Sequence, residues 1–203
     1  MNAPDAPIAR MKAEDRRELI IEHATAVFGD YGYYGATTDQ IARAAGVSQP
    51  YVVRMFGTKE RLFVAVLERA LDLLMAAFRG ALAEGGPDPV QRRMGLAYVG
   101  LIEQRGLLLS LMHAFALGSD PVIGARAREG FLLVFEFLRT EAGLTSAEAG
   151  AFLAGGMLNN TLIGLRMTDV ASDPLAYELL QACFPEKLDL VVGIGDSYRP
   201  EPR

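Results

Sequence analysis

Two short helix patterns joined by a tight turn, within residues 37–56, constrain the fold of this chain more than any other feature of its sequence. Thr37 can act as the N-cap of the first helix, and Gln40, three residues later, can complete a capping box. Gly46 can take the left-handed conformation that ends this helix, and Ser48 then offers a second N-cap. Each pattern has apolar residues four apart on one side, so we expect the two helices to cross closely as a helix-turn-helix.

The other side of the second helix carries side chains that can read DNA. Gln pairs with adenine and Arg with guanine through two hydrogen bonds each, and a helix N-terminus favours a phosphate. A lysine at the start of the next helix opposes the helix dipole, which makes sense if an anion lies nearby. The expected DNA-binding residues are Thr37, Ser48, Gln49, Pro50, Tyr51, Arg54 and Lys59. Short patterns of this kind also occur as purely structural helix pairs, so the pattern alone leaves both interpretations open.

A longer stretch, from Arg16 to about Leu67, resembles the DNA-binding domain of TetR-family transcriptional regulators. The matching segments, in order, are Ala26-Val27-Phe28, Gly32-Tyr33, Thr37-Thr38, Ile41-Ala42, Ala45-Gly46-Val47-Ser48, Phe56, Thr58-Lys59-Glu60 and Leu62-Phe63. The resemblance implies a homodimer, a divergent helical C-terminal domain, and usually repression that a small molecule relieves. It also implies DNA contacts at the residues named above, apart from Ser48.

Two positions depart from the family pattern. Val53 stands where many members have a tyrosine that contacts phosphate, and Met55 stands where a polar or aromatic residue is frequent. Tyr51 can supply the missing hydroxyl from two positions earlier, or the operator contact is lost.

The remaining pattern predicts an all-α fold of about nine helices without strands. We expect a flexible N-terminal arm (residues 1–11), a three-helix helix-turn-helix DNA-binding domain (residues 12–60), and a C-terminal ligand-binding and dimerisation domain (residues 61–203), linked by a long helix over 58–83. The net charge of −5 lies in the C-terminal part, because residues 1–62 hold eight basic and eight acidic side chains. A DNA-binding domain without net charge depends on a few clustered basic side chains, rather than on its net charge, to bind DNA.

Helix starts and stops in the C-terminal part are marked by capping residues. Asp88-Pro89, Asp120-Pro121 and Asp173-Pro174 each place a carboxylate before a proline, and Thr145 with Glu148 forms a second capping box. These signals predict helices over 89–104, 106–117, 121–142, 145–168 and 174–184. The tail over 188–198 is ambiguous, with its glycines favouring a loop.

Large soft and aromatic side chains from several of these helices predict an apolar ligand cavity, although an ordinary core is the alternative for each of them. The expected cavity residues are Met94, Tyr98, Met112, His113, Phe115, Phe131, Phe135, Met157 and Asn160. Glycines inside the 145–168 helix indicate close approach of another helix, which suggests an isologous dimer interface. The expected interface residues are Phe152, Gly156, Asn159, Ile163, Met167, Leu175, Leu179 and Phe184. Whether Asn159 and Asn160 face the cavity or the interface stays open.

The leading hypothesis is a cytoplasmic, homodimeric repressor that binds a palindromic double-stranded operator and is released by a small apolar effector. The single Cys183 fits a reducing compartment, and no apolar stretch is long enough to cross a membrane. No catalytic triad, metal cluster or nucleotide fingerprint is visible, so we expect neither an enzyme nor a cofactor. An all-helical enzyme or a ligand-sequestering protein is the alternative, and an activator or a regulator without a ligand is a third possibility.

Overall fold

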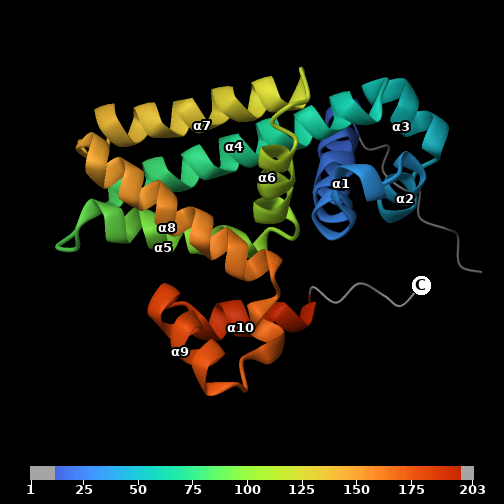
Figure 1. Cartoon of the computed structure of the whole chain (residues 1–203). Helices are drawn as coiled ribbons and strands as arrows, with labels where there is room; N and C mark the ends of the chain where they lie inside the picture. The colour runs from blue at the N-terminus through green and yellow to red at the C-terminus, as the bar shows by residue number, and fades with distance from the viewer. Residues whose placement is uncertain (1–11, 198–203) are drawn as a thin grey trace, which may run out of the picture.

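The computed structural model describes residues 12–197, which form an all-helical chain (Figure 1). The predicted arm over residues 1–11 lies outside the described residues. In chain order the elements are α1 (Ala13–Gly35), α2 (Thr38–Ala44), α3 (Gln49–Phe56), α4 (Lys59–Glu84), α5 (Val90–Gly100), the 3₁₀ turn η1 (Leu101–Glu103), α6 (Leu107–Ala116), α7 (Ile123–Thr140), α8 (Ser146–Gly164), the 3₁₀ turn η2 (Met167–Val170), α9 (Pro174–Cys183) and α10 (Leu188–Ser197).

The long helix α4 connects the two ends of the molecule. Helices α1, α2 and α3 gather around its first turns, while α5 and α7 pack along its later part and α8 packs on α5 and α7 (Figure 1). Helix α6 stands between them and contacts α1, α4, α7 and α8. Helices α9 and α10 lie beyond α8, on the side away from α7 (Figure 1).

The apolar interior divides into three clusters. The first joins α1, α2, α3 and the start of α4, and it also takes in Ala114, Leu117 and Ile123 from α6 and α7. The second fills the space between α4, α5, α7 and α8, and the third lies under α9 and α10. Because the first cluster includes residues of α6 and α7, the N-terminal helices share a core with the rest of the chain.

Most predicted capping residues lie where the sequence indicated. Thr37 and Thr145 form complete capping boxes, and the Asp173 carboxylate accepts from the backbone N–H groups of Leu175 and Ala176. The Asp120 carboxylate accepts from Val122 and Ile123 and so caps the turn that leads into α7.

One sequence prediction about this part of the fold is wrong. Asp88 does not cap α5, because its carboxylate pairs with the Arg92 guanidinium and Pro89 occupies the N-cap position. The segment 188–197, which was ambiguous in sequence with its glycines favouring a loop, is helix α10. Val191 of α10 is 2% exposed in the third cluster, so burial of this face outweighs the helix-breaking tendency of the glycines.

Candidate nucleic-acid interface and ligand cavity

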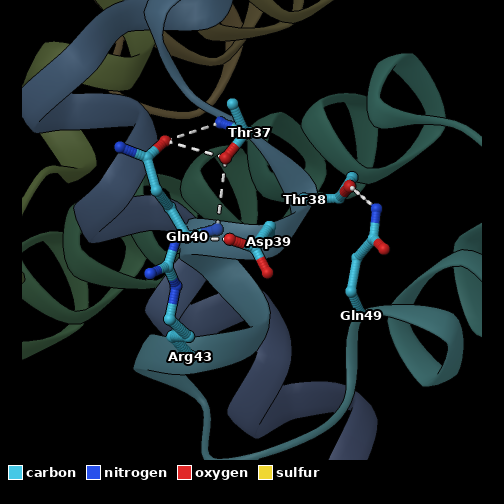
Figure 2. A network of polar contacts seen from close by, with 6 residues as sticks. All are labelled: Thr37, Thr38, Asp39, Gln40, Arg43 and Gln49. Atoms are coloured by element: carbon cyan, nitrogen blue, oxygen red, sulfur yellow. Dashed lines mark hydrogen bonds and ion pairs between the residues drawn. The ribbon is translucent and has the colours of Figure 1, made fainter.

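The start of α2 is held by the hydrogen bonds of a capping box. The Thr37 hydroxyl accepts from the backbone N–H of Gln40 at 3.2 Å, while the Gln40 side-chain oxygen accepts from the backbone N–H of Thr37 at 2.8 Å (Figure 2). Gly46, with φ of 65°, then reverses the chain toward α3. Ile41, Val52 and other apolar residues of the pair are buried against α1 and α4, so the crossing of α2 and α3 is fixed by caps and by packing.

The face of α3 that points away from this core is exposed and carries polar side chains beside Pro50 and Val53. Ser48, Gln49, Pro50 and Arg54 are exposed, and Tyr51 is half-buried. Ser48 occupies the N-cap position without capping through its side chain. The Gln49 carboxamide donates to the Thr38 hydroxyl at 3.1 Å, which ties the first turn of α3 to α2 (Figure 2).

Two arginines flank the ring of Tyr51. The guanidinium carbon of Arg54 lies 5.0 Å from the ring centroid, and that of Arg16 lies 5.5 Å away. Arg16 comes from α1 and was not expected at this surface. Little in the sequence indicated that Arg16 lies at this surface, because the tertiary structure decides which turn of α1 lies beside Tyr51. The result is a positive cluster around an aromatic ring at the outer face of α3.

Lys59 has a structural role that the sequence did not indicate. Its ammonium group donates to the carbonyl oxygens of Tyr33 at 2.8 Å and Ala36 at 3.1 Å, and lies 4.7 Å from the Tyr33 ring centroid. These carbonyls lie at the end of α1, where backbone acceptors lack partners within the helix. Local carbonyls therefore account for a cation in the first turn of α4, and an ammonium has one further N–H to offer.

Helices α1 and α6 touch through their backbones. A Cβ atom added at Gly29 would lie 2.4 Å from the Cα atom of Gly106. The Ser110 hydroxyl donates to the carbonyl of Thr25 at 3.2 Å, and the ring Nε2 of His113 lies 3.4 Å from the carbonyl oxygen of Gly29. These contacts connect α6 to α1, the first helix of the N-terminal domain.

An apolar cavity of about 270 Å³ lies between α4, α5, α6, α7 and α8. Five predicted residues line it, namely Tyr98, Phe115, Phe131, Met157 and Asn160. The Tyr98 hydroxyl donates to the side-chain oxygen of Asn160 at 2.7 Å, and burial raises the pKa of Tyr98 to about 12. The phenol therefore stays neutral and supplies a fixed polar group in a mainly apolar wall.

Four other predicted cavity residues lie elsewhere. Met94 is fully buried in the second core cluster, and Phe135 packs against the same cluster, because their helices turn these side chains inward. Met112 and His113 line a second cavity of about 590 Å³ between α1, α6, α8 and η2. This second cavity has charged groups of both signs in its wall, including Asp30, Arg166 and Asp169.

Helix α8 presents a different outer face from the one expected for an interface. Phe152, Gly156 and Asn159 line the first cavity, so Asn159 and Asn160 both face it. Ile163 and Met167 pack against the third cluster, and Phe184 is 1% exposed. The glycines did not indicate which face of α8 lies outward, because the cavity side is as rich in glycine as the outer side. Leu175 and Leu179 of α9 are exposed, as an interface requires.

The exposed side of α8 is instead small and apolar. Its residues are Ala151, Ala154, Gly155, Leu158 and Leu165, of which Ala151 and Gly155 also line the first cavity. They follow the helical repeat, and residues 149–165 include no charged side chain. A charge-free helix face of this length in contact with water is unusual and is typical of a surface that another chain covers.

Among the residues whose side chains the structure describes, no three His, Cys, Asp or Glu side chains gather as metal ligands. None of the described helices is long and apolar enough to span a bilayer.

Comparisons with known proteins agree with this geometry. The family described as bacterial regulatory proteins, tetR family, matches residues 20–66. The HTH-type transcriptional activator FasR of Mycolicibacterium smegmatis is 28% identical over 151 residues, which cover 72% of this chain and 69% of FasR.

Two solved structures share the fold. A TetR-family transcriptional regulator from Streptomyces coelicolor superposes with a TM-score of 0.57 at 21% identity, over 94% of this chain and 92% of its own. The multidrug binding protein EbrR, complexed with imidazole, gives a TM-score of 0.55 at 20% identity over 99% of both chains. FasR and the Streptomyces protein are named as regulators of transcription, and not as enzymes.

Proposed function

The chain belongs to the TetR family of DNA-binding transcriptional regulators, and from this premise we propose that it acts in the cytoplasm as a homodimer on a palindromic operator and that a small apolar effector changes its affinity for that operator. In this proposal residues 12–60 read DNA, and residues 61–203 bind the effector and form the dimer. The observation that carries it is the polar outer face of α3, held by buried residues on its inner side.

The proposed DNA contacts divide into base-reading and phosphate-binding groups. Gln49 and Arg54 are exposed, and Tyr51 is half-buried against the first core cluster with its ring beside Arg54; all three can reach base edges in a major groove. Thr37, Ser48 and the N-terminus of α3 can meet phosphates, as can the remaining N–H of Lys59. Arg16 joins this group because it shares the Tyr51 ring with Arg54.

The test is selection of bound duplexes from a random pool by the purified protein, followed by titration of the best duplex. Arg54→Ala is expected to weaken binding because each good bidentate base contact is worth about 1–3 kcal/mol. Arg79→Ala serves as the control, since Arg79 is an exposed arginine on the later part of α4. An Arg54→Ala/Lys59→Ala double variant that binds the selected duplex as tightly as the wild type would refute the assignment.

The proposed dimer uses the outer face of α8 as the centre of its interface. Small residues there allow two helices to approach closely, and symmetry places a second copy of the same face opposite the first. The two α3 helices then need a separation of about one helical turn of DNA, roughly 34–36 Å, to enter successive major grooves. Half-site spacing in the selected duplexes measures this separation directly.

Helix α6 is the proposed connection between effector and operator. Leu111, Ala114 and Phe115 line the first cavity, whereas Gly106 and Ser110 of the same helix contact α1. An effector that shifts α6 would therefore move α1 together with α2 and α3, the helix-turn-helix pair that packs on it. Whether the effector releases or strengthens operator binding decides between repression and activation, and a reporter gene downstream of the selected duplex measures the sign.

A further inference from the structure

We propose that the first cavity selects apolar carboxylic acids, with the carboxylate of the effector bound by Arg126 at the rim of the cavity. This inference rests on the proposed function, because it names the chemical class of the effector that the same cavity would take. Arg126 is in the first turn of α7 and is the one charged residue in the cavity wall within the described part of the chain.

The charge of Arg126 is available to a ligand. Its guanidinium lies 3.7 Å from a carboxylate oxygen of Glu68 and 3.6 Å from one of Glu129, and both distances are too long for hydrogen bonds. The two carboxylates are exposed, at 50% and 70% of their side-chain surface, so their pairing with Arg126 is screened by water and worth little. A planar guanidinium with free N–H groups matches a carboxylate through two parallel hydrogen bonds.

The position of Arg126 also suits an amphipathic molecule. Its side chain is 27% exposed, so a carboxylate bound there keeps part of its hydration while the apolar body enters the cavity. Helices α7 and α8 meet at the loop that joins them and diverge toward the other end (Figure 1). Arg126, near the start of α7, and Asn160, near the end of α8, both line the cavity. The rest of the wall consists mainly of leucines, phenylalanines, alanines and glycines, together with Tyr98.

The main competing ligand class is an organic cation. Phe78, Tyr98, Phe115, Phe131 and Phe152 line the cavity, and aromatic rings attract cations. No carboxylate of the described residues joins them in the wall, however, and a cation would lie close to the positive charge of Arg126. Glu68 and Glu129 lie beside Arg126 but are not part of the wall, so among the described residues the wall itself offers one charged partner, the Arg126 guanidinium, which suits an anion rather than a cation of the same shape.

The experiment compares three probes with the same apolar chain, octanoate, octan-1-ol and octylammonium, by calorimetric titration of the full-length protein. Octanoate is expected to bind at least about tenfold more tightly than octan-1-ol, which corresponds to about 1.4 kcal/mol. Arg126→Gln is expected to abolish this preference and Arg126→Lys to restore part of it. Arg79→Gln is the matched control, because Arg79 also lies 3.6 Å from a single exposed carboxylate but is outside the cavity wall.

Thermal denaturation of each variant separates loss of binding from loss of folding. Equal binding of octanoate and octan-1-ol by the wild type, a preference that survives Arg126→Gln, or tightest binding of octylammonium would each overturn the inference. Titration of the selected duplex without any probe distinguishes failure of this inference from failure of the proposed function. If the duplex binds but octanoate does not, only the effector class fails; if no duplex binds, the regulatory function fails whatever the probes do.

Discussion

Replacing Gly29 with alanine would place a methyl group inside the contact between α1 and α6. The new Cβ would lie 2.4 Å from Cα and 3.0 Å from the carbonyl oxygen of Gly106, and both are backbone atoms that cannot rotate away. Overpacking of this kind costs about 1–3 kcal/mol, and contact with backbone places this site at the upper end. The higher helix propensity of alanine than of glycine stabilises α1 by up to about 1 kcal/mol, so we expect a net loss of about 2 kcal/mol in the free energy of unfolding.

For a chain of this length a loss of about 2 kcal/mol lowers the melting temperature by roughly 4–8 °C. Gly80→Ala is the matched control, since Gly80 is inside α4 and a Cβ there would meet no atom within 4 Å. That variant is expected to raise the melting temperature by a few degrees, because only the propensity term remains. A Gly29→Ala variant that melts at or above the wild type in the same calorimetric scan would show that α1 and α6 are not in fixed contact.

Two further predictions concern single polar groups. Thr37→Ala removes the two hydrogen bonds of the Thr37 hydroxyl, which accepts from the backbone N–H of Gln40 and donates to the Gln40 side-chain oxygen. It is expected to lower the free energy of unfolding by about 1 kcal/mol in urea denaturation. Ser48→Ala is expected to leave it unchanged, because the Ser48 hydroxyl caps nothing. Tyr98 is neutral in the folded chain, with a pKa of about 12 against an ordinary value of 10.0, so its contribution to stability is complete below pH 10 and is lost as the pH rises toward 12. Denaturation over this range should show a loss of stability that Tyr98→Phe lacks, and equal alkaline profiles of the two proteins would contradict the raised pKa.

The sequence predicted the reading pair well because its structure is determined locally. Thr37, Gln40 and Gly46 fix caps and a turn through contacts within a few residues, and such contacts follow from spacing alone. The prediction that Asp88 caps α5 was wrong for the opposite reason. Asp88 has a partner, Arg92, that also binds Glu186 from the far end of the chain, and this three-way pairing depends on tertiary packing.

The cavity and the outer face of α8 were harder to predict. Met94 and Tyr98 lie four apart on the same helix, yet Met94 is fully buried in the core while Tyr98 borders the cavity. Composition cannot separate the two, because both are large and apolar and the difference depends on where α8 crosses α5. Arg126 was not predicted as a cavity residue, because a single charged side chain in a mainly apolar wall follows no periodic sequence pattern.

The proposed interface on α8 can be tested with one charged substitution. Leu158 is 45% exposed at the centre of the outer face, and in a symmetric dimer Leu158→Glu would bury two unpaired carboxylates close to each other. Removing a charge from water without a partner costs several kcal/mol, so the variant is expected to sediment as a monomer and to lose affinity for the selected duplex. Leu133→Glu is the control, because Leu133 on α7 has nearly the same exposure, 42%, and lies outside α8. Leu175→Glu then tests whether α9 extends the interface, since Leu175 is 75% exposed. A Leu158→Glu protein that remains a dimer and binds the duplex normally would move the interface away from α8, and with it the geometry that places two α3 helices on one operator.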